Sequence, residues 1–158
     1  MPSGDELRTL MRRFPAGVTV VTAEHESERL GLTVGSLVSL SLEPPLVGIS
    51  ISRQAPLHEL LRRAGTFAVS MLAAGQEHLA QHFARSGTPP LVMWTGVSTR
   101  TGVAGAPLLA GALGWLECRV WAAYDVSTHS FFVGEVLALE AGEPERPLVY
   151  VEHEYVHV

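Results

Sequence analysis

The chain has 158 residues and a mass of 17.0 kDa, which is typical of one domain whose core needs no disulfide or structural metal. Hydrophobic residues make up 47% and charged residues 17%, and this composition excludes a disordered chain. The formal net charge of −5 has the wrong sign for a protein that binds nucleic-acid phosphates, so we expect no nucleic-acid partner.

The first half of the chain predicts two short helices and several strands. Capping-box spacing between Ser3 and Glu6, followed by a periodic apolar stripe, predicts a helix over residues 3–13. Alternating β-branched residues then predict strands. A run that starts at a proline and stops at a glycine predicts a second helix. The expected segments after the first helix are a strand over Val18–Glu24, an extended run over Leu30–Leu42, a strand over Leu46–Ser52 and a helix from Pro56 to Gly65.

The second half predicts one further helix and mostly strands. In order, the expected segments are a strand over Thr66–Leu72, a helix over Gln76–Arg85, a loop over 86–112, strands over Gly114–Tyr124 and Phe131–Glu140 joined by a turn at Asp125–Ser130, and a final strand over Leu148–Tyr155. Strands with short helices, and no alternation of strand and helix, indicate an antiparallel barrel with helical caps. We therefore predict a mainly β fold in one domain, residues 1–158.

Absences in the sequence exclude several kinds of chemistry. The chain has no lysine, which excludes a Walker-type phosphate loop and Schiff-base catalysis. Its single cysteine, Cys118, cannot form an internal disulfide, which favours a reducing compartment. The first residues lack an apolar signal core, and the longest uncharged run, Thr101–Leu116, is too short to span a membrane and is broken by glycines. These features predict a soluble, cytoplasmic protein with no membrane partner.

Two histidine pairs could suggest a metal site. The segment His153–His157 matches the zinc-protease pattern H-E-x-x-H, which requires both histidines on one helical turn. Here the segment favours a strand, in which residues four apart lie roughly 13 Å from each other, so we interpret the match as coincidence. His78 and His82 lack a third ligand at a fixed spacing, and a solvated helix face explains them. We therefore predict no metal, and we interpret Cys118 as a core residue rather than a nucleophile.

Small polar residues follow one another along the run from Thr33 to Ser41, and Ser50, Ser52 and Arg53 end the next strand. If these two strands pair, then hydroxyls, free backbone N–H groups and one guanidinium lie together at one rim of the sheet. Such a set suits a phosphate with a flat polar ring beside it. Alternation of serine on a solvent-facing side is the simpler explanation of the same pattern.

The order of several segments adds a resemblance to a known family. These segments are Phe14–Ala23 (FPAGVTVVTA), Gly31–Val47 (GLTVGSLVSLSLEPPLV), Gly65–Leu72 (GTFAVSML), Leu79–Ala84 (LAQHFA), Leu116–Cys118 (LEC) and His129–Val136 (HSFFVGEV). Together they resemble the flavin reductase-like, FMN-binding split-barrel proteins, which are the reductase components of two-component flavin monooxygenases. The resemblance covers residues 8–155, and it rests on the ordered set rather than on one motif.

This resemblance implies a six-stranded antiparallel FMN-binding split barrel that forms a homodimer with flavin at the subunit interface. It implies that residues 33–37 edge the isoalloxazine ring through main-chain N–H groups and that Arg53 and neighbouring serines hold the ribityl phosphate. It also implies that His129 borders the nicotinamide at the catalytic site. The implied flavin-binding residues are Thr33, Val34, Gly35, Ser36, Leu37, Ser50, Ser52, Arg53, Gln54 and Phe83.

The chain also departs from the family pattern in two places. The turn before the histidine is Ser127-Thr128-His129, without the family's glycine and aspartate, so the choice between NADH and NADPH stays open. Gln54, Ala55 and Pro56 replace the hydroxyl pair that often follows the family's arginine, so phosphate contacts there are expected from the backbone or to be weaker.

The resulting hypothesis is an NAD(P)H:flavin oxidoreductase that reduces FMN or FAD and supplies a partner oxygenase. Hydride transfer between two cofactor rings needs no protein nucleophile, which agrees with the lack of a catalytic triad in the sequence. The alternative is a non-catalytic flavin-binding protein, which the altered turn before His129 would allow. A zinc hydrolase based on His153 and His157 is the third hypothesis.

Overall fold

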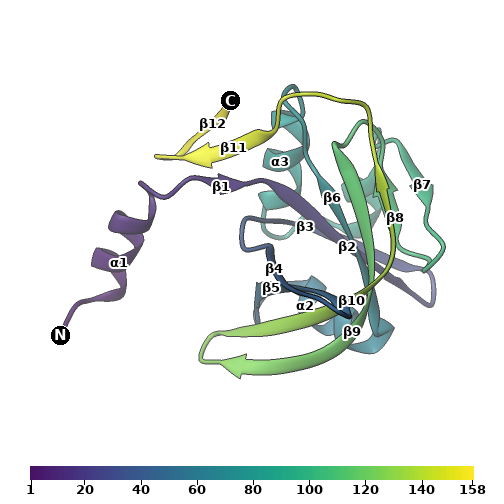
Figure 1. The fold of residues 1–158 in the computed structure, drawn as a ribbon, viewed down its shortest axis with the longest axis horizontal. Helices are drawn as coiled ribbons and strands as arrows, with labels where there is room; N and C mark the ends of the chain where they lie inside the picture. The colour runs from purple at the N-terminus through teal and green to yellow at the C-terminus, as the bar shows by residue number, and fades with distance from the viewer.

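The structure, a computed structural model that describes residues 1–158, has far more residues in strands than in helices (Figure 1). The four helices are α1 (Gly4–Met11), α2 (Pro56–Ala64), α3 (Glu77–Ala84) and α4 (Pro90–Trp94). The twelve strands are β1 (Ala16–Gly17), β2 (Thr19–His25), β3 (Glu28–Val34), β4 (Val38–Leu42), β5 (Pro45–Ser52), β6 (Thr66–Met71), β7 (Thr99–Thr101), β8 (Pro107–Leu109), β9 (Gly114–Val126), β10 (His129–Ala141), β11 (Leu148–Val151) and β12 (Glu154–His157).

One antiparallel sheet of seven strands, in the order β3-β2-β6-β9-β10-β5-β4, forms the body of the molecule. The two ends of this sheet approach each other where Ser36, just after β3, is hydrogen-bonded to Ser50 of β5. The Ser50 amide donates to Ser36 Oγ at 2.9 Å, and Ser36 Oγ donates to the Ser50 carbonyl at 3.2 Å. The sheet is therefore rolled into an incompletely closed barrel, which confirms the predicted split-barrel class.

The predicted count of six strands differs from the seven in this sheet. The run Leu30–Leu42 is not continuous, because Gly35, Ser36 and Leu37 leave the sheet and separate β3 from β4. Beyond Gly35 the chain turns away, and Val38 and the residues after it pair with β5 in a hairpin instead. Propensity alone does not distinguish such a break from an uninterrupted strand.

The long strands β9 and β10 bend so that the sheet can curve. Their register shifts between Val133 and Gly134 and again between Val136 and Ala138, and such irregularities increase local twist and curvature. A Cβ on Gly134 would lie only 2.5 Å from the Phe67 ring and 2.9 Å from Cys118 Cβ. Glycine at this position therefore lets the curved sheet close over the aromatic core.

Helix α2 covers one end of the barrel and confirms the sequence prediction at both of its termini. Pro56 occupies the first turn, and Gly65 ends the helix with a φ of 70°, a conformation that glycine adopts without a Cβ penalty. Leu57, Leu60 and Leu61 are buried. These leucines pack into the same core as the strands.

Two predicted segments differ from the structure. The stretch 86–112, expected to be a loop, contains α4, β7 and β8, whose few residues carry too little periodic pattern to reveal them. The final segment is two strands joined by a tight turn rather than one strand. Glu152 and His153 form that turn with φ values of 51° and 63°, and they supply none of the glycine or asparagine that normally signals it.

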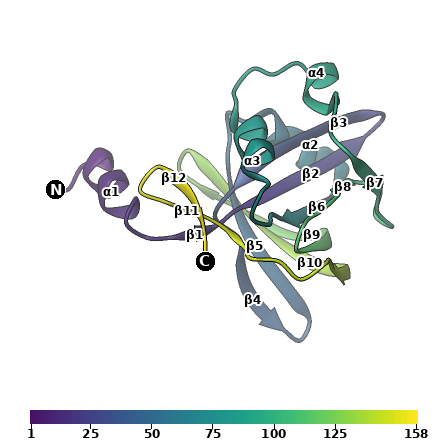
Figure 2. The same ribbon diagram turned by 90° about the horizontal axis from the view of Figure 1, so that it is seen from above.

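The turn between β9 and β10 is shorter than predicted, because the ladder continues to the pair Val126 and His129. Helix α1, with the predicted capping box between Ser3 and Glu6, contributes no buried residue and stands away from the barrel (Figure 2). No helix in the structure has both the length and the apolar character needed to cross a membrane.

Candidate functional site

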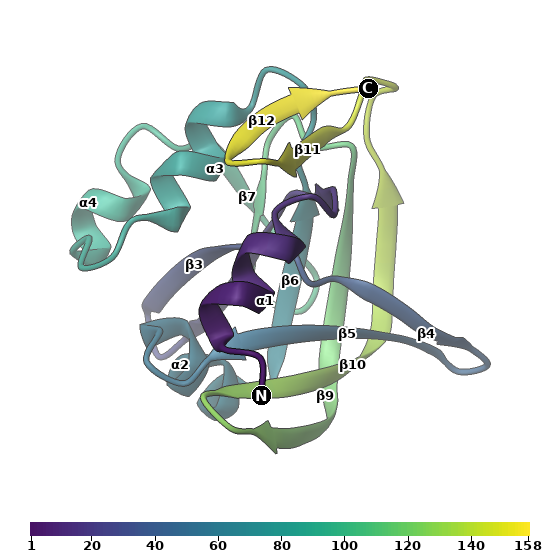
Figure 3. The same ribbon diagram turned by 90° about the vertical axis from the view of Figure 1, so that its left-hand side faces the viewer.

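A cavity of about 650 Å³ lies beside β3, between the start of α2 and the segment that joins α3 to α4. Figure 3 shows α2 on one side of β3 and α3 and α4 on the other. The cavity is lined by Glu28, Leu30, Gly31, Leu32, Ser52, Gln54, Ala55, Pro56, Leu57, Phe83, Ala84, Arg85, Ser86, Gly87, Thr88, Pro90 and Met93. Its size and its mixture of apolar and polar residues are those of a small-molecule site.

Phe83 and Met93 form much of the apolar lining. Phe83 is almost fully buried, and its ring lies against β3 at Gly31, where a Cβ would come within 2.9 Å of two ring carbons. The Gly31 amide also lies 3.4 Å from Met93 Sδ. Gly31 therefore allows α3 and α4 to approach β3 closely, which brings both side chains to the cavity.

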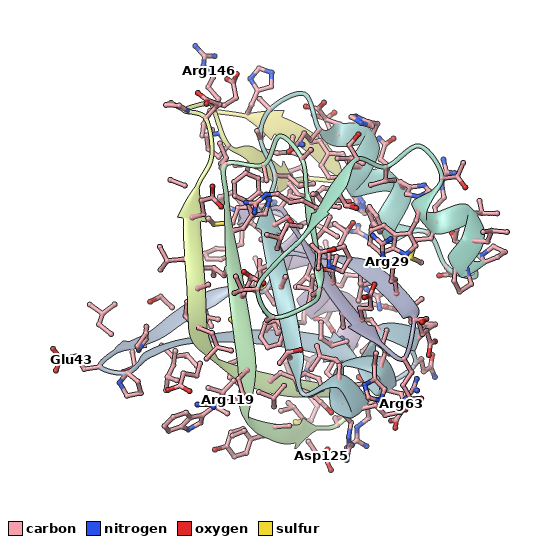
Figure 4. The ribbon with its side chains drawn as sticks, turned by 90° about the vertical axis from the view of Figure 1, so that its right-hand side faces the viewer. Arg29, Glu43, Arg63, Arg119, Asp125 and Arg146 are labelled. Atoms are coloured by element: carbon pink, nitrogen blue, oxygen red, sulfur yellow. The ribbon has the colours of Figure 1, made fainter.

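The far wall of the cavity is held by α4. Trp94 Nε1 donates to the Arg29 carbonyl at 2.9 Å, and the Arg29 guanidinium lies 4.5 Å from the centre of the Trp94 ring. His82 Nε2 donates to the Met93 carbonyl at 2.6 Å. Arg29 thus lies on the side of the barrel where α3 and α4 pack (Figure 4). His82 is a structural partner of α4 in this arrangement rather than half of a pair with His78.

The structure brings the ends of the two predicted hydroxyl-bearing strands together. Ser52, Gln54 and Phe83 line the cavity, while Ser36 is hydrogen-bonded to the Ser50 backbone. At the end of β3, Thr33 and Val34 make hydrogen bonds within the barrel. Thr33 Oγ1 donates to the Ala80 carbonyl at 2.6 Å.

The amides of Gly35, Ser36 and Leu37 donate to no acceptor within the chain. Their neighbour Val34 is buried and accepts a hydrogen bond from Thr19 Oγ1 at its carbonyl. Three consecutive free N–H groups thus lie where β3 leaves the barrel. Gly35 is exposed and Ser36 and Leu37 are partly exposed, so these donors face solvent and are available to a ligand.

Arg53 lies outside the cavity lining. Its guanidinium forms an ion pair with Asp125 in β9, and its amide donates to the Thr128 carbonyl at 3.0 Å. The Arg53 hydrogen bond and charge lower the pKa of the exposed Asp125 carboxyl. Figure 4 shows Asp125 at the end of the β9–β10 hairpin, at the same end of the barrel as Arg63 of α2.

His129 opens β10 directly opposite Ser52 of β5. Its ring is exposed, and its Nδ1 lies 3.0 Å from Thr128 Oγ1. The predicted residue is thus adjacent to the strand end that carries Ser52. The other predicted pair, His153 and His157, lies in the turn and the second strand of the β11–β12 hairpin, so the H-E-x-x-H segment is not helical.

Sequence reasoning missed His58, which lies behind this strand end. His58 is 6% exposed, and its Nε2 is hydrogen-bonded to Ser130 Oγ at 2.7 Å. Burial is the main cause that lowers the pKa of its imidazole, and the charge of Arg62 lowers it further. Glu59 and Asp125 act in the opposite direction, and Arg53 adds a smaller lowering effect. The sequence did carry one signal of this burial, because His58 lies on the apolar face of the predicted helix.

The lowered pKa of His58 predicts how stability depends on pH. Below about pH 6.5, the unfolded chain gains a proton on this residue before the folded protein does. The free energy of unfolding should therefore be highest above pH 6.5 and fall as the pH drops toward the folded-state pKa. Urea denaturation at pH 7.5 and 5.5 measures this fall.

Replacing the imidazole with a neutral amide, His58→Gln, should reduce the fall between the two pH values. The exposed His78 of α3 provides the control, because His78→Gln should leave the dependence unchanged. An identical pH dependence in wild type and His58→Gln would contradict the assignment.

Comparisons with known proteins agree with this architecture. A family model described as "Flavin reductase like domain" matches residues 11–158. An NADH-dependent FAD reductase of Streptomyces globisporus is 46% identical over 134 residues, covering 84% of this chain and 73% of the relative. The reductase component of 4-hydroxyphenylacetate 3-monooxygenase from Thermus thermophilus is 40% identical over 151 residues, covering 96% and 94%.

Solved structures of flavin reductases have the same fold. BorF, the flavin reductase component of a bacterial two-component tryptophan halogenase, superposes with a TM-score of 0.92 at 36% identity, covering 99% of this chain and 98% of BorF. The NADH:FAD oxidoreductase SgcE6 of Streptomyces globisporus superposes with a TM-score of 0.93 at 37% identity, covering 100% and 95%. This chain belongs to the flavin reductase-like domain family.

Proposed function

We propose that the protein is an NAD(P)H:flavin oxidoreductase, which transfers a hydride from a nicotinamide to FMN or FAD. It acts as the reductase of a two-component system and delivers reduced flavin to a partner monooxygenase. The relatives named as NADH-dependent FAD reductase and as the reductase component of a monooxygenase support this function over a non-catalytic flavin-binding role. The flavin ring supplies the hydride-accepting chemistry, so the protein needs to bind and orient two rings rather than to provide a nucleophile.

The observation that carries this proposal is the set of free amides at Gly35, Ser36 and Leu37. An isoalloxazine ring has oxygen and nitrogen acceptors along one edge and flat apolar faces. Three free donors on a barrel rim match that edge. Leu32, three residues before Gly35, lines the cavity together with the buried Phe83. The residues present therefore fit a flavin.

Residues of this chain would bind and orient the two rings. Ser52 and Gln54 would bind the polar ribityl chain and its phosphate, since both line the cavity. Phe83 excludes water from the apolar wall, which strengthens hydrogen bonds made there. His129, opposite Ser52 at the start of β10, would contact the nicotinamide.

The experiment that tests this function is NAD(P)H oxidation by the purified protein with and without added FMN, FAD or riboflavin. The proposal expects a rate that depends on flavin and saturates with it, followed by re-oxidation in air. A protein that retains flavin which neither nucleotide reduces under anaerobic conditions would instead be a non-catalytic flavin carrier. Comparison of NADH with NADPH determines which nucleotide the Ser127-Thr128 turn accepts.

We further propose a homodimer, on the basis of apolar side chains that the single chain leaves exposed. They lie on the edge strand β4 and on β10, two strands away in the same sheet. These residues are Val38, Leu40, Leu42, Leu137 and Leu139. Several large apolar side chains exposed on one sheet are typical of a protein interface, and an uncovered edge strand favours pairing. Sedimentation equilibrium should give twice 17.0 kDa, and a monomer at micromolar concentration would contradict the dimer.

A further inference from the structure

The end of the β9–β10 hairpin that carries His129 extends beyond the core of the barrel. Residues 123–129 are all exposed, and Ser130 is the first buried residue of β10. His129 also forms the last pair of the ladder between β5 and β10, opposite Ser52. The ends of secondary-structure elements open more easily than their centres. The position of His129 therefore depends on the contacts that hold this end of the hairpin on the barrel.

A surface contact and a buried contact hold the hairpin end. At the surface, Arg53 forms an ion pair with Asp125, but both side chains are exposed, and solvent screening makes the contribution of such a pair small. Inside, His58 Nε2 lies 2.7 Å from Ser130 Oγ, and the two residues are 6% and 1% exposed. Breaking a buried hydrogen bond leaves both polar groups without a partner and without water. The bond between His58 and Ser130 is therefore the stronger restraint.

The His58 ring contacts β10 at a second point. Its centre lies 5.3 Å from that of the Phe132 ring, with the two planes at 65° to each other, an edge-to-face arrangement that is favourable between aromatic rings. Phe132 is buried and lies two residues after Ser130, so both side chains point to the inner face of the strand. Contacts at two successive inward positions fix the direction of the strand as well as its place.

On its other side, His58 belongs to the helix that forms part of the cavity wall. Ala55, Pro56 and Leu57 line the cavity, and the His58 amide donates to the Ala55 carbonyl at 2.9 Å. The residue that bonds to Ser130 is thus one position away from the cavity lining. His58 connects the wall of the cavity directly to the strand that begins at His129.

We propose that His58 is a positioning residue for the reductase reaction, which holds His129 at a fixed place relative to the cavity through its bond to Ser130. This inference rests on the proposed function, which gives His129 its contact with the nicotinamide. Hydride transfer requires two rings in close contact and correctly oriented, so a small displacement of a residue that contacts one ring lowers the rate. His58 affects the rate without touching either ring.

The test removes the buried bond and keeps both aromatic rings. Ser130→Ala should lower kcat/KM for the nicotinamide substrate roughly fivefold, while the dissociation constant of flavin stays within about twofold. His58→Phe keeps a ring against Phe132 and should have the same effect. Because the two residues act through one bond, the double variant should lose no more than either single variant. His58→Gln, whose side-chain amide can hydrogen-bond to Ser130, should recover part of the rate.

Ser70→Ala is the matched control. Ser70 of β6 is also buried, and its Oγ accepts a hydrogen bond from the Leu109 amide at 3.1 Å. This variant should lower the free energy of unfolding about as much as Ser130→Ala does and leave the nicotinamide kinetics unchanged. Amide hydrogen exchange of residues 123–129 provides a readout that needs no activity. Exchange there should be faster in Ser130→Ala than in the wild type, and unchanged in Ser70→Ala.

An equal loss of kcat/KM in Ser70→Ala would show that Ser130→Ala acts through stability alone, and the positioning role would be wrong. Unchanged nicotinamide kinetics in Ser130→Ala would overturn the role as well, whether or not exchange becomes faster. If the wild type does not oxidise NADH or NADPH, the reductase function is contradicted. In that case faster exchange confined to residues 123–129 would still support His58 as the anchor of the hairpin, and unchanged exchange would overturn it.

Discussion

Replacing Phe83 with alanine is expected to lower the free energy of unfolding by about 3–5 kcal/mol. The side chain is 1% exposed, and its ring centre lies 5.0 Å from that of His82 and 5.3 Å from that of Trp94. Its removal would leave a void between β3 and α3 that the strand at Gly31 cannot fill. Urea denaturation monitored by tryptophan fluorescence measures the loss.

The loss is a large share of the total stability of a domain of this size, which is on the order of 5–15 kcal/mol. Phe83→Leu therefore serves as the variant that stays folded. It should lose less stability and still raise the KM for flavin, because the flat ring that lines the cavity is gone. Leu91→Ala on α4, 86% exposed, provides the control and should change stability by under about 0.5 kcal/mol. A Phe83→Ala protein as stable as this control would refute the assigned packing.

His129→Ala is expected to lower kcat/KM for the nicotinamide substrate by roughly tenfold while leaving the dissociation constant of flavin within about twofold. The ring lies at the start of β10 beside Ser52, outside the cavity lining. Loss of the His129 side chain should therefore weaken the interaction with the nicotinamide ring more than the interaction with the flavin ring. Steady-state kinetics with NADH and NADPH, combined with flavin titration, measures the two effects separately.

Thr128→Ala is the matched variant for this position, because Thr128 Oγ1 lies 3.0 Å from His129 Nδ1 and restrains the ring. Thr128→Ala should lower kcat/KM for the nicotinamide substrate by a smaller factor than His129→Ala does. Unchanged nicotinamide kinetics in His129→Ala would remove this residue from the site. A selective loss of flavin affinity in His129→Ala would instead show that His129 contacts the flavin ring.

Local sequence signals were sufficient for several elements of the barrel. The Pro56 start and Gly65 stop of α2, the capping box of α1 and the alternating residues of β2 each appear in the structure as predicted. Such signals act within a few residues of one another, so neighbouring sequence carries them. The tight turn at Glu152 and His153 was missed, because both residues adopt positive φ there without the glycine or asparagine that normally marks such a turn.

The candidate site was predictable only in part. Ser52, Gln54 and Phe83 line the cavity, and Ser36 meets Ser50 as the pairing of hydroxyl-bearing strands suggested. Arg85 and His58 gave no comparable signal. Arg85 belongs to the cavity because α3 packs against β3 at Gly31, a contact between segments about 50 residues apart in the sequence.

The sequence by itself determined the mainly β class, the barrel, and the family, because these depend on composition, periodicity and the order of segments along the chain. Only the tertiary structure decided which cation faces the cavity. Arg53 and Arg85 are equivalent as arginines in a sequence, but barrel closure sets one beside Asp125 and leaves the other without a partner. Electrostatic pairing acts through space, and the distances that govern it exist only once the chain has folded.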